Sequence, residues 1–159
     1  MKLCVFGTFL SSSSNVYPFY ISCSRVHFLG QKKRFDALAS EVQPVAATLS
    51  STRGHRYQAA KCIDGRTVGP DSPSENPDLC QTKDEAEPWL AIDYGKKVTI
   101  ERVELFNRRD CCGDRTRNVD IRVSDELPTS GSQMFSGGNL FGHFAGSGND
   151  GQHIVISGF

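Results

Sequence analysis

The densest group of side chains able to do chemistry lies in the stretch 107–115, which reads Asn-Arg-Arg-Asp-Cys-Cys-Gly-Asp-Arg. Arg108 and Arg115 carry planar guanidinium groups that donate hydrogen bonds and accept none. Asp110 can orient a guanidinium or accept a hydrogen bond from a hydroxyl group. Residues of these types, placed this closely, can bind a ligand that is rich in oxygen atoms.

Two adjacent cysteines, Cys111 and Cys112, sit in the middle of this stretch. Their Cα atoms are about 3.8 Å apart, so a disulfide between them would close a small strained ring with a flat, apolar surface. Hydrogen-bond donors beside such a surface suit a sugar that has one C–H face. In the alternative interpretation, the arginines pair with Asp110 and Asp114 on the surface and the cysteines bond elsewhere. These residues alone leave both interpretations open.

Short strands flank the stretch and predict an all-β fold. Val119, Ile121 and Val123 alternate with charged residues, as in a half-buried strand, and 89–94 is an apolar run. Over 98–106 the alternation slips by one residue, which predicts a β-bulge. The body of the chain lacks a long helical periodicity, and turn residues separate the strands. This pattern is typical of a β-sandwich or jelly roll.

The composition bounds the function. A chain of 159 residues fits one domain, and 18 Lys and Arg balance 18 Asp and Glu. A net charge of zero lacks the basic field that attracts nucleic acid or anionic membranes, so we expect neither as a partner. The longest apolar stretch is far shorter than the roughly 20 residues that span a bilayer, so we expect no membrane insertion.

Six cysteines point to an exported domain of moderate size. None has the spacing of a zinc ribbon, so disulfides are favoured over metal ligation. Four of them lie in the body and allow three pairings. These four are Cys62, Cys80, Cys111 and Cys112.

Residues 1–37 differ in character from the body. They begin with one lysine and a short apolar run, as a minimal secretory signal does, and continue without helical or strand periodicity. We expect this segment to be a leader or disordered.

Four motifs, in order, resemble those of the F-type lectins, also called fucolectins. Arg108, Asp110 and Arg115 match the second part of the family's sugar motif, which reads His, a spacer and Arg-x-Asp-x4-Arg. The other three motifs are an opening strand with two serines, an Asp-Gly turn and a Pro-Trp strand. They correspond to residues 46–52, 61–65 and 88–94.

The resemblance implies a discoidin-like jelly-roll β-sandwich over residues 38–159, with the sugar site in loops at one end. The family's last strand carries Leu-Cys-Glu-Val, whereas residues 153–159 resemble the strand before it. We therefore expect a C-terminally truncated domain that lacks its last strand.

The resemblance also assigns the sugar site. The motif's spacing places Gln81 where the family has His, and its amide could contact an axial hydroxyl. The family pairs the two adjacent cysteines, and it leaves Cys62 as the partner of Cys80 because the usual partner lies in the missing strand. The implied sugar-binding residues are Gln81, Arg108, Asp110, Cys111, Cys112 and Arg115.

A structural calcium of the family is held by the Asp-Gly turn and by the terminal Cys-Glu. Here Asp64 is present, Arg66 replaces a usual Asn, and the Glu is absent. Carbonyl groups of Lys61 and Arg66 are further candidate ligands. Calcium takes six to eight oxygen ligands. Calcium is thus a candidate cofactor with an incomplete set of ligands.

The resemblance implies a secreted, extracellular lectin without enzymatic activity that recognises terminal fucose on glycans, as in innate immunity; an oligomer is compatible with this function. The alternative is a discoidin-like structural or adhesion module that has lost sugar binding, which Gln81 and the truncated end favour. A glycoside-processing enzyme would need two carboxylates facing each other, and no such pair stands out.

Overall fold

The computed structural model describes residues 2–7, 22–29, 43–66, 79–85, 87–125 and 138–158, with the first two ranges described by their backbone alone. In these ranges the chain forms nine strands and two 3-10 helices. The strands are β1 (Lys2–Gly7), β2 (Ser22–Leu29), β3 (Ala46–Leu49), β4 (Cys80–Gln81), β5 (Trp89–Asp93), β6 (Arg102–Asn107), β7 (Arg117–Ser124), β8 (Asn139–Ser147) and β9 (His153–Ser157). The helices are η1 (Ala59–Cys62) and η2 (Gly113–Arg115).

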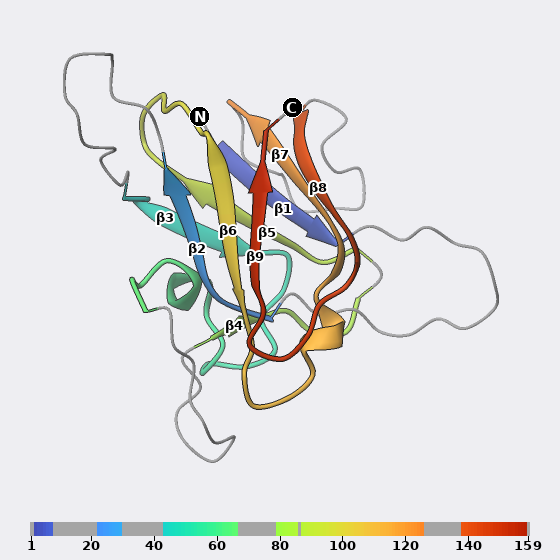
Figure 1. Cartoon of the computed structure of the whole chain (residues 1–159). Coiled ribbons are helices and arrows are strands. Elements are labelled where there is room, and N and C mark those ends of the chain that lie inside the picture. Colours follow the sequence, from blue (N-terminus) through green and yellow to red (C-terminus); the bar gives the residue numbers. More distant parts are fainter. Residues whose placement is uncertain are drawn as a thin grey trace.

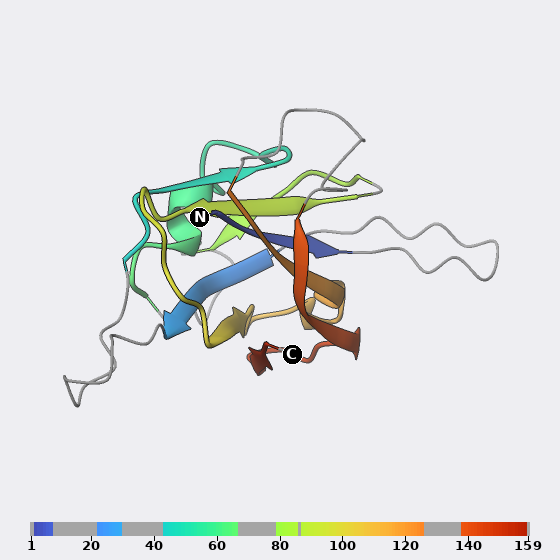
Figure 2. The same cartoon turned by 90° about the horizontal axis from the view of Figure 1, so that it is seen from above.

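Two antiparallel sheets face each other. One has five strands in the order β3-β5-β1-β7-β8, and the other has four in the order β4-β2-β6-β9. Figure 2 shows the two layers from above, with β3 and β5 in one layer and β2, β6 and β9 in the other. This arrangement confirms the all-β, discoidin-like sandwich expected from the sequence.

The core lies between the sheets and follows from alternation along the strands. Val103 and Leu105 of β6 are buried, as are Ile154 and Ile156 of β9, while the residues between them reach solvent. In β5 four successive residues, 89–92, are buried because both of its faces are covered. Burying each such aliphatic side chain contributes about 1.5–3 kcal/mol.

The alternation expected in β7 is confirmed, since Val119 and Ile121 are buried and their neighbours are half-buried. The bulge expected within 98–106 is wrong. β6 begins only at Arg102, and the preceding residues form no strand. Val98 and Ile100 still pack against the core from that connecting segment. The one-residue shift in the spacing of apolar residues therefore coincides with the start of β6.

The described parts of residues 1–37, which are 2–7 and 22–29, form two strands, whereas the sequence predicted a leader or disordered segment. β1 pairs with β5 on one side and with β7 on the other, and β2 lies between β4 and β6 (Figure 1). The sequence of β2 mixes polar, aromatic and basic residues, so its strand pairing depends on its neighbours in the sheet. An export role for this segment stays a prediction.

Among the described residues, no helix is long and apolar enough to cross a membrane.

Candidate functional site

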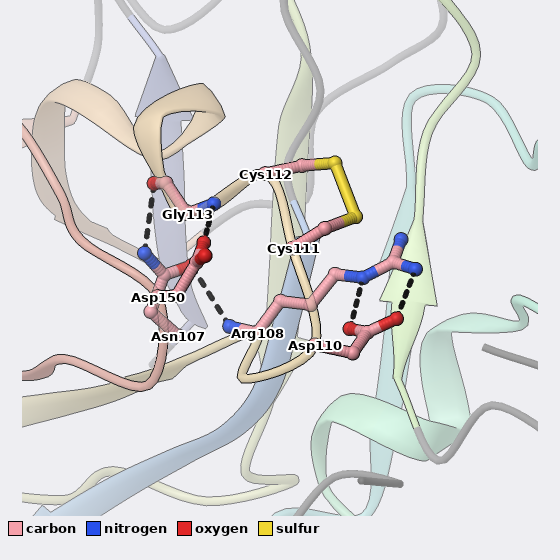
Figure 3. Close-up of a disulfide and its surroundings, with 7 residues drawn as sticks. All are labelled: Asn107, Arg108, Asp110, Cys111, Cys112, Gly113 and Asp150. Carbon is pink, nitrogen blue, oxygen red and sulfur yellow. Dashed lines mark hydrogen bonds and ion pairs between the residues drawn. A yellow bond between two sulfur atoms is a disulfide. The ribbon is translucent and has the colours of Figure 1, made fainter. Parts of the chain in front are cut away.

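The stretch singled out in the sequence forms the connection from β6 to β7 at one end of the sandwich. It leaves β6 at Asn107, turns through the two cysteines and re-enters regular structure in η2. Figure 3 shows that the cysteine pair and the Arg108–Asp110 pair project to one side of this loop, while Asn107 and Asp150 lie on the other. One side thus carries the candidate binding groups, and the other anchors the loop.

Arg108 and Asp110 form a bidentate ion pair. Nε of Arg108 donates to Oδ1 of Asp110 at 2.5 Å, and Nη2 donates to Oδ2 at 2.6 Å. Their side chains are 13% and 3% exposed, respectively. A guanidinium has five N–H donors, so two bonds to Asp110 leave three that have no partner among the described residues.

The ion pair shifts the pKa values of Arg108 and Asp110 in the direction that favours their charged forms. The hydrogen bond to Asp110 raises the pKa of Arg108 above its usual value. The hydrogen bond from Arg108 lowers the pKa of the Asp110 carboxyl. Asp110 is thus a carboxylate at neutral pH and holds the guanidinium in one orientation.

Cys111 and Cys112 are joined by a disulfide, with their Cα atoms 3.8 Å apart. Both residues are half-buried, so part of the pair reaches solvent. Cys112 has a φ of 66°, in the left-handed region that non-glycine residues rarely adopt. The disulfide therefore lies at a sharp turn, on the same side of the loop as the guanidinium of Arg108 (Figure 3).

Asn107 anchors the loop from the other side. Its Nδ2 donates to the carbonyls of Gly113 at 2.8 Å and Asn149 at 2.9 Å. Its Oδ1 accepts from the backbone N–H of Arg108 and from the hydroxyl of Thr116. The residue is only 3% exposed. One buried amide thus links the start and the end of the cysteine loop to a second loop.

The second loop, 148–152, packs directly against the cysteine loop. Asp150 accepts a 2.6 Å hydrogen bond from the backbone N–H of Gly113, and the N–H of Gly151 donates to the carbonyl of Arg108. A Cβ atom on Gly113 would lie 2.3 Å from the carbonyl carbon of Asn149. Only glycine allows this close approach of two backbones.

Arg115 lies at the end of η2 and is half-buried, and its backbone N–H donates to the carbonyl of Cys112 at 3.2 Å. It belongs to the same loop as Arg108, as the motif requires. The alternative interpretation, in which the arginines pair with Asp110 and Asp114, is confirmed for Arg108 and Asp110. Asp114 contacts Arg117 at 3.5 Å, and the two cysteines bond to each other rather than elsewhere.

Gln81 is placed differently from the expectation. It lies in β4 and is only 1% exposed, so its side chain offers no open surface to a sugar. Its backbone N–H donates to the carbonyl of Tyr57, and its carbonyl accepts from Arg53. Its Nε2 has no hydrogen-bond partner among the described residues. These backbone hydrogen bonds tie Gln81 to the 53–57 segment.

The disulfide between Cys62 and Cys80 is confirmed. It joins η1 to β4, both cysteines are fully buried, and their Cα atoms are 5.4 Å apart. It therefore ties the Asp-Gly turn to the strand that carries Gln81.

The expected calcium ligands lie at the Asp-Gly turn, and calcium binding there stays a prediction. Oδ1 of Asp64 accepts the backbone N–H of Arg66 at 3.0 Å, which is an Asx turn. Lys61 and Arg66 could offer only carbonyl oxygens, and the described residues contain no cluster of three His, Cys, Asp or Glu side chains. The observed geometry thus accounts for Asp64 as a turn former.

Sequence reasoning did not single out Asn107 or Asp150. Asn107 stood at the edge of the motif without an assigned role, and Asp150 lies far along the chain. A signal was present for the second loop, because residues 148–152 consist of two glycines and three polar residues. Only the packing of the two loops shows what that cluster does.

Comparison with known proteins shows the family of this chain. The family described as "NedA-like, galactose-binding domain" matches residues 61–142, just over half of the chain. The chain belongs to this family. The match covers the cysteine loop and β4 to β7, and with the fucolectin relatives it confirms the expected F-type lectin or discoidin-like domain.

Three relatives show the range of similarity. A pentraxin fusion protein of Xenopus laevis is 30% identical over 58% of this chain and 21% of its own length. A fucolectin of Anguilla anguilla is 29% identical over 54% of this chain and 52% of its own, and fucolectin-5 of Anguilla japonica is 33% identical over 43% and 35%. The chain thus spans about half or less of these relatives. No solved structure matched it.

Proposed function

We propose that this chain is a non-enzymatic, secreted lectin domain that binds terminal fucose on glycans. The sugar would lie against the loop that carries Arg108, Asp110, the Cys111–Cys112 disulfide and Arg115. The partners would be fucosylated glycans of other molecules. The similarity to fucolectins supports the ligand class, and the loop geometry supports the site.

The observation that carries this proposal is the Arg108–Asp110 pair beside the disulfide (Figure 3). Asp110 holds the guanidinium rigid, so its three remaining N–H groups can meet sugar oxygens with little loss of side-chain entropy. A disulfide offers a polarisable, apolar surface beside them. Fucose fits both features, because it combines a C–H and methyl face with hydroxyls and a ring oxygen.

The test compares Arg108→Ala with Arg109→Ala on immobilised fucose. Arg109 is the neighbouring residue and is exposed, so it controls for loss of one positive charge. We expect Arg108→Ala to weaken the Kd by about ten- to a hundredfold, since hydrogen bonds to a charged group contribute about 1.5–3 kcal/mol. Arg109→Ala should bind as the unmodified chain does.

Arg108→Lys separates binding from folding, because it keeps a charge beside Asp110 but cannot make the bidentate pair. We expect it to melt close to the unmodified chain and to bind fucose weakly. Elution with free fucose and with galactose then reports the sugar preference. Equal retention of all three variants would show that this loop does not bind fucose.

A second candidate function is supported by the burial of Gln81. A site with no accessible side chain at residue 81 offers fewer polar groups than the family's motif, which favours a structural or adhesion module that has lost sugar binding. A glycan array on the unmodified chain distinguishes the two functions. Binding to no glycan, by a chain with a cooperative melting transition, would favour the adhesion module.

A further inference from the structure

The two strands in residues 1–29 occupy interior positions in both sheets. β1 lies between β5 and β7 of the five-stranded sheet, and β2 lies between β4 and β6 of the other (Figure 1). Each strand is paired on both sides, and β1 forms five residue pairs with β5 and six with β7. The strands after residue 43 would therefore fall into separate groups without these two.

β2 also pairs with β4, which carries Gln81, and with β6, which leads into the cysteine loop. The sugar motif assigned residues of both regions to the site. In the register of the sheet, Cys23 lies opposite Cys80 of β4 on one side and opposite Asn107 of β6 on the other. Ser22 lies opposite Gln81. Asn107 is the residue that anchors the cysteine loop. β2 thus joins, through backbone pairing, the strand that leads into the loop and the strand that carries the second motif position.

We propose that β1 and β2 are an integral part of the binding domain, and that β2 positions the cysteine loop through its pairing with the end of β6. The sugar-binding part of this inference rests on the proposed function. The structural part stands on the strand pairing alone.

Backbone hydrogen bonding is the physical reason. An unpaired N–H or C=O group in a covered sheet is costly, and removal of β1 would leave such groups along both β5 and β7. Removal of β2 would free the edge of β6 up to Asn107. The hydrogen bonds of Asn107 depend on the position of its backbone, so the loop would lose its fixed geometry.

The chain provides its own reporter for this test. Trp89 is the single tryptophan, is 6% exposed and lies opposite Phe6 of β1 in the sheet. Loss of β1 would expose the indole to water. Its fluorescence emission would shift to longer wavelength, and acrylamide would quench it more strongly.

The experiment starts from the full chain with a protease recognition sequence inserted within residues 30–42. After cleavage, we expect the two pieces to elute together in native buffer and the emission of Trp89 to stay unchanged. Separation of the pieces in denaturant, followed by refolding of the larger one alone, should shift the emission and abolish retention on fucose. A synthetic peptide of residues 1–29 should restore both.

Two single variants of the uncut chain support this test. Val26→Pro removes a backbone donor within β2, whereas Ser12→Pro places the same residue between the two strands and serves as the control. We expect Val26→Pro to lower the melting temperature and fucose retention, and Ser12→Pro to change neither.

The outcomes separate the inference from the proposed function. A larger piece that refolds alone with unshifted Trp89 emission would overturn the inference, whether or not it binds fucose. An uncut chain that fails to bind fucose, combined with peptide-dependent recovery of the emission, would overturn the proposed function and leave the structural inference supported.

Discussion

At the scale of single residues, the side chain of Arg108 both pairs with Asp110 and offers hydrogen-bond donors to the proposed ligand. Two of its N–H groups are held by Asp110, and the others face away from that carboxylate. The same loop depends on Asn107, which has no direct part in the proposed binding surface but anchors the loop through the side-chain hydrogen bonds to Gly113, Asn149, Arg108 and Thr116. Residues of the proposed binding surface and residues that anchor the loop are thus neighbours within a few positions of the sequence.

Asn107→Ala tests the anchor. The substitution leaves the carbonyls of Gly113 and Asn149 without their donor in a buried place, so we expect the free energy of unfolding to fall by about 1–3 kcal/mol. Fucose affinity should fall as well, because the loop loses its fixed position. Urea denaturation and fucose titration measure both effects. The exposed Asn139→Ala is the control, and similar behaviour of the two variants would contradict an anchoring role.

The pH dependence of binding follows from Asp110. Its pKa is lowered in the folded chain by the hydrogen bond from Arg108. The stabilisation by the pair is therefore complete above the ordinary carboxyl pKa, about 4, and is lost as the pH falls through the lower, folded value. We expect fucose affinity to be constant from pH 7 down to the ordinary carboxyl pKa of about 4, and to drop only at the lower pH at which Asp110 of the folded chain takes up a proton.

Asp110→Asn is the matching variant, because it keeps the shape but removes this titration. It should bind fucose weakly at pH 7 and show no further loss that is due to this residue at lower pH. Identical pH profiles for the two chains would place the acid-sensitive group elsewhere.

At the scale of elements, the site consists of two loops that pack against each other. The cysteine loop after β6 and the 148–152 loop before β9 share backbone hydrogen bonds, and the two strands are themselves paired in one sheet. The pairing of β6 with β9 brings the loops to the same end of the sandwich. Gly113 and Gly148 then permit an approach that any side chain would block.

Gly113→Ala should disrupt this contact. The added Cβ would lie 2.3 Å from the carbonyl carbon of Asn149 and 2.4 Å from the backbone nitrogen of Asp150, and neither can move alone. We expect a loss of about 1–3 kcal/mol in the free energy of unfolding and weaker fucose binding. Thermal melting and titration calorimetry measure these effects.

Gly54→Ala is the matched control, because a Cβ at Gly54 would meet nothing within 4 Å. Its melting temperature should stay close to that of the unmodified chain. An equal loss for both substitutions would mean that the close approach of the two loops does not decide the result.

At the scale of the whole molecule, stability comes from a sandwich core with one buried cross-link. The core includes apolar residues of both sheets, and the Cys62–Cys80 disulfide is fully buried with it. A disulfide that closes a loop of this size stabilises a protein by about 3 kcal/mol, because it restricts the unfolded chain.

Replacement of both Cys62 and Cys80 by Ala should therefore lower the free energy of unfolding by about 3 kcal/mol and leave the cysteine loop intact. Mass mapping of non-reduced peptides should find Cys62 linked to Cys80 and Cys111 linked to Cys112. The informative contrary result is a bond from Cys23 to Cys80, since these residues lie opposite each other in the sheet.

The sequence by itself determined what is local. The candidate binding groups lie within the stretch 107–115, so the sequence already placed Arg108, Asp110 and the cysteines side by side. Strand alternation predicted the buried face of β7, because side chains two residues apart share one face of a strand. Motifs in order predicted the fold, which the family match confirms.

The tertiary structure alone decided what depends on distant pairing. It brought the 148–152 loop to Asn107, covered Gln81 and inserted β1 and β2 between strands that lie far along the chain. The physical reason is that these outcomes depend on strand register and on backbone hydrogen bonds between remote segments. The amino acids of residues 1–29 carry little of that information, because the neighbouring strands supply most of the drive to pair.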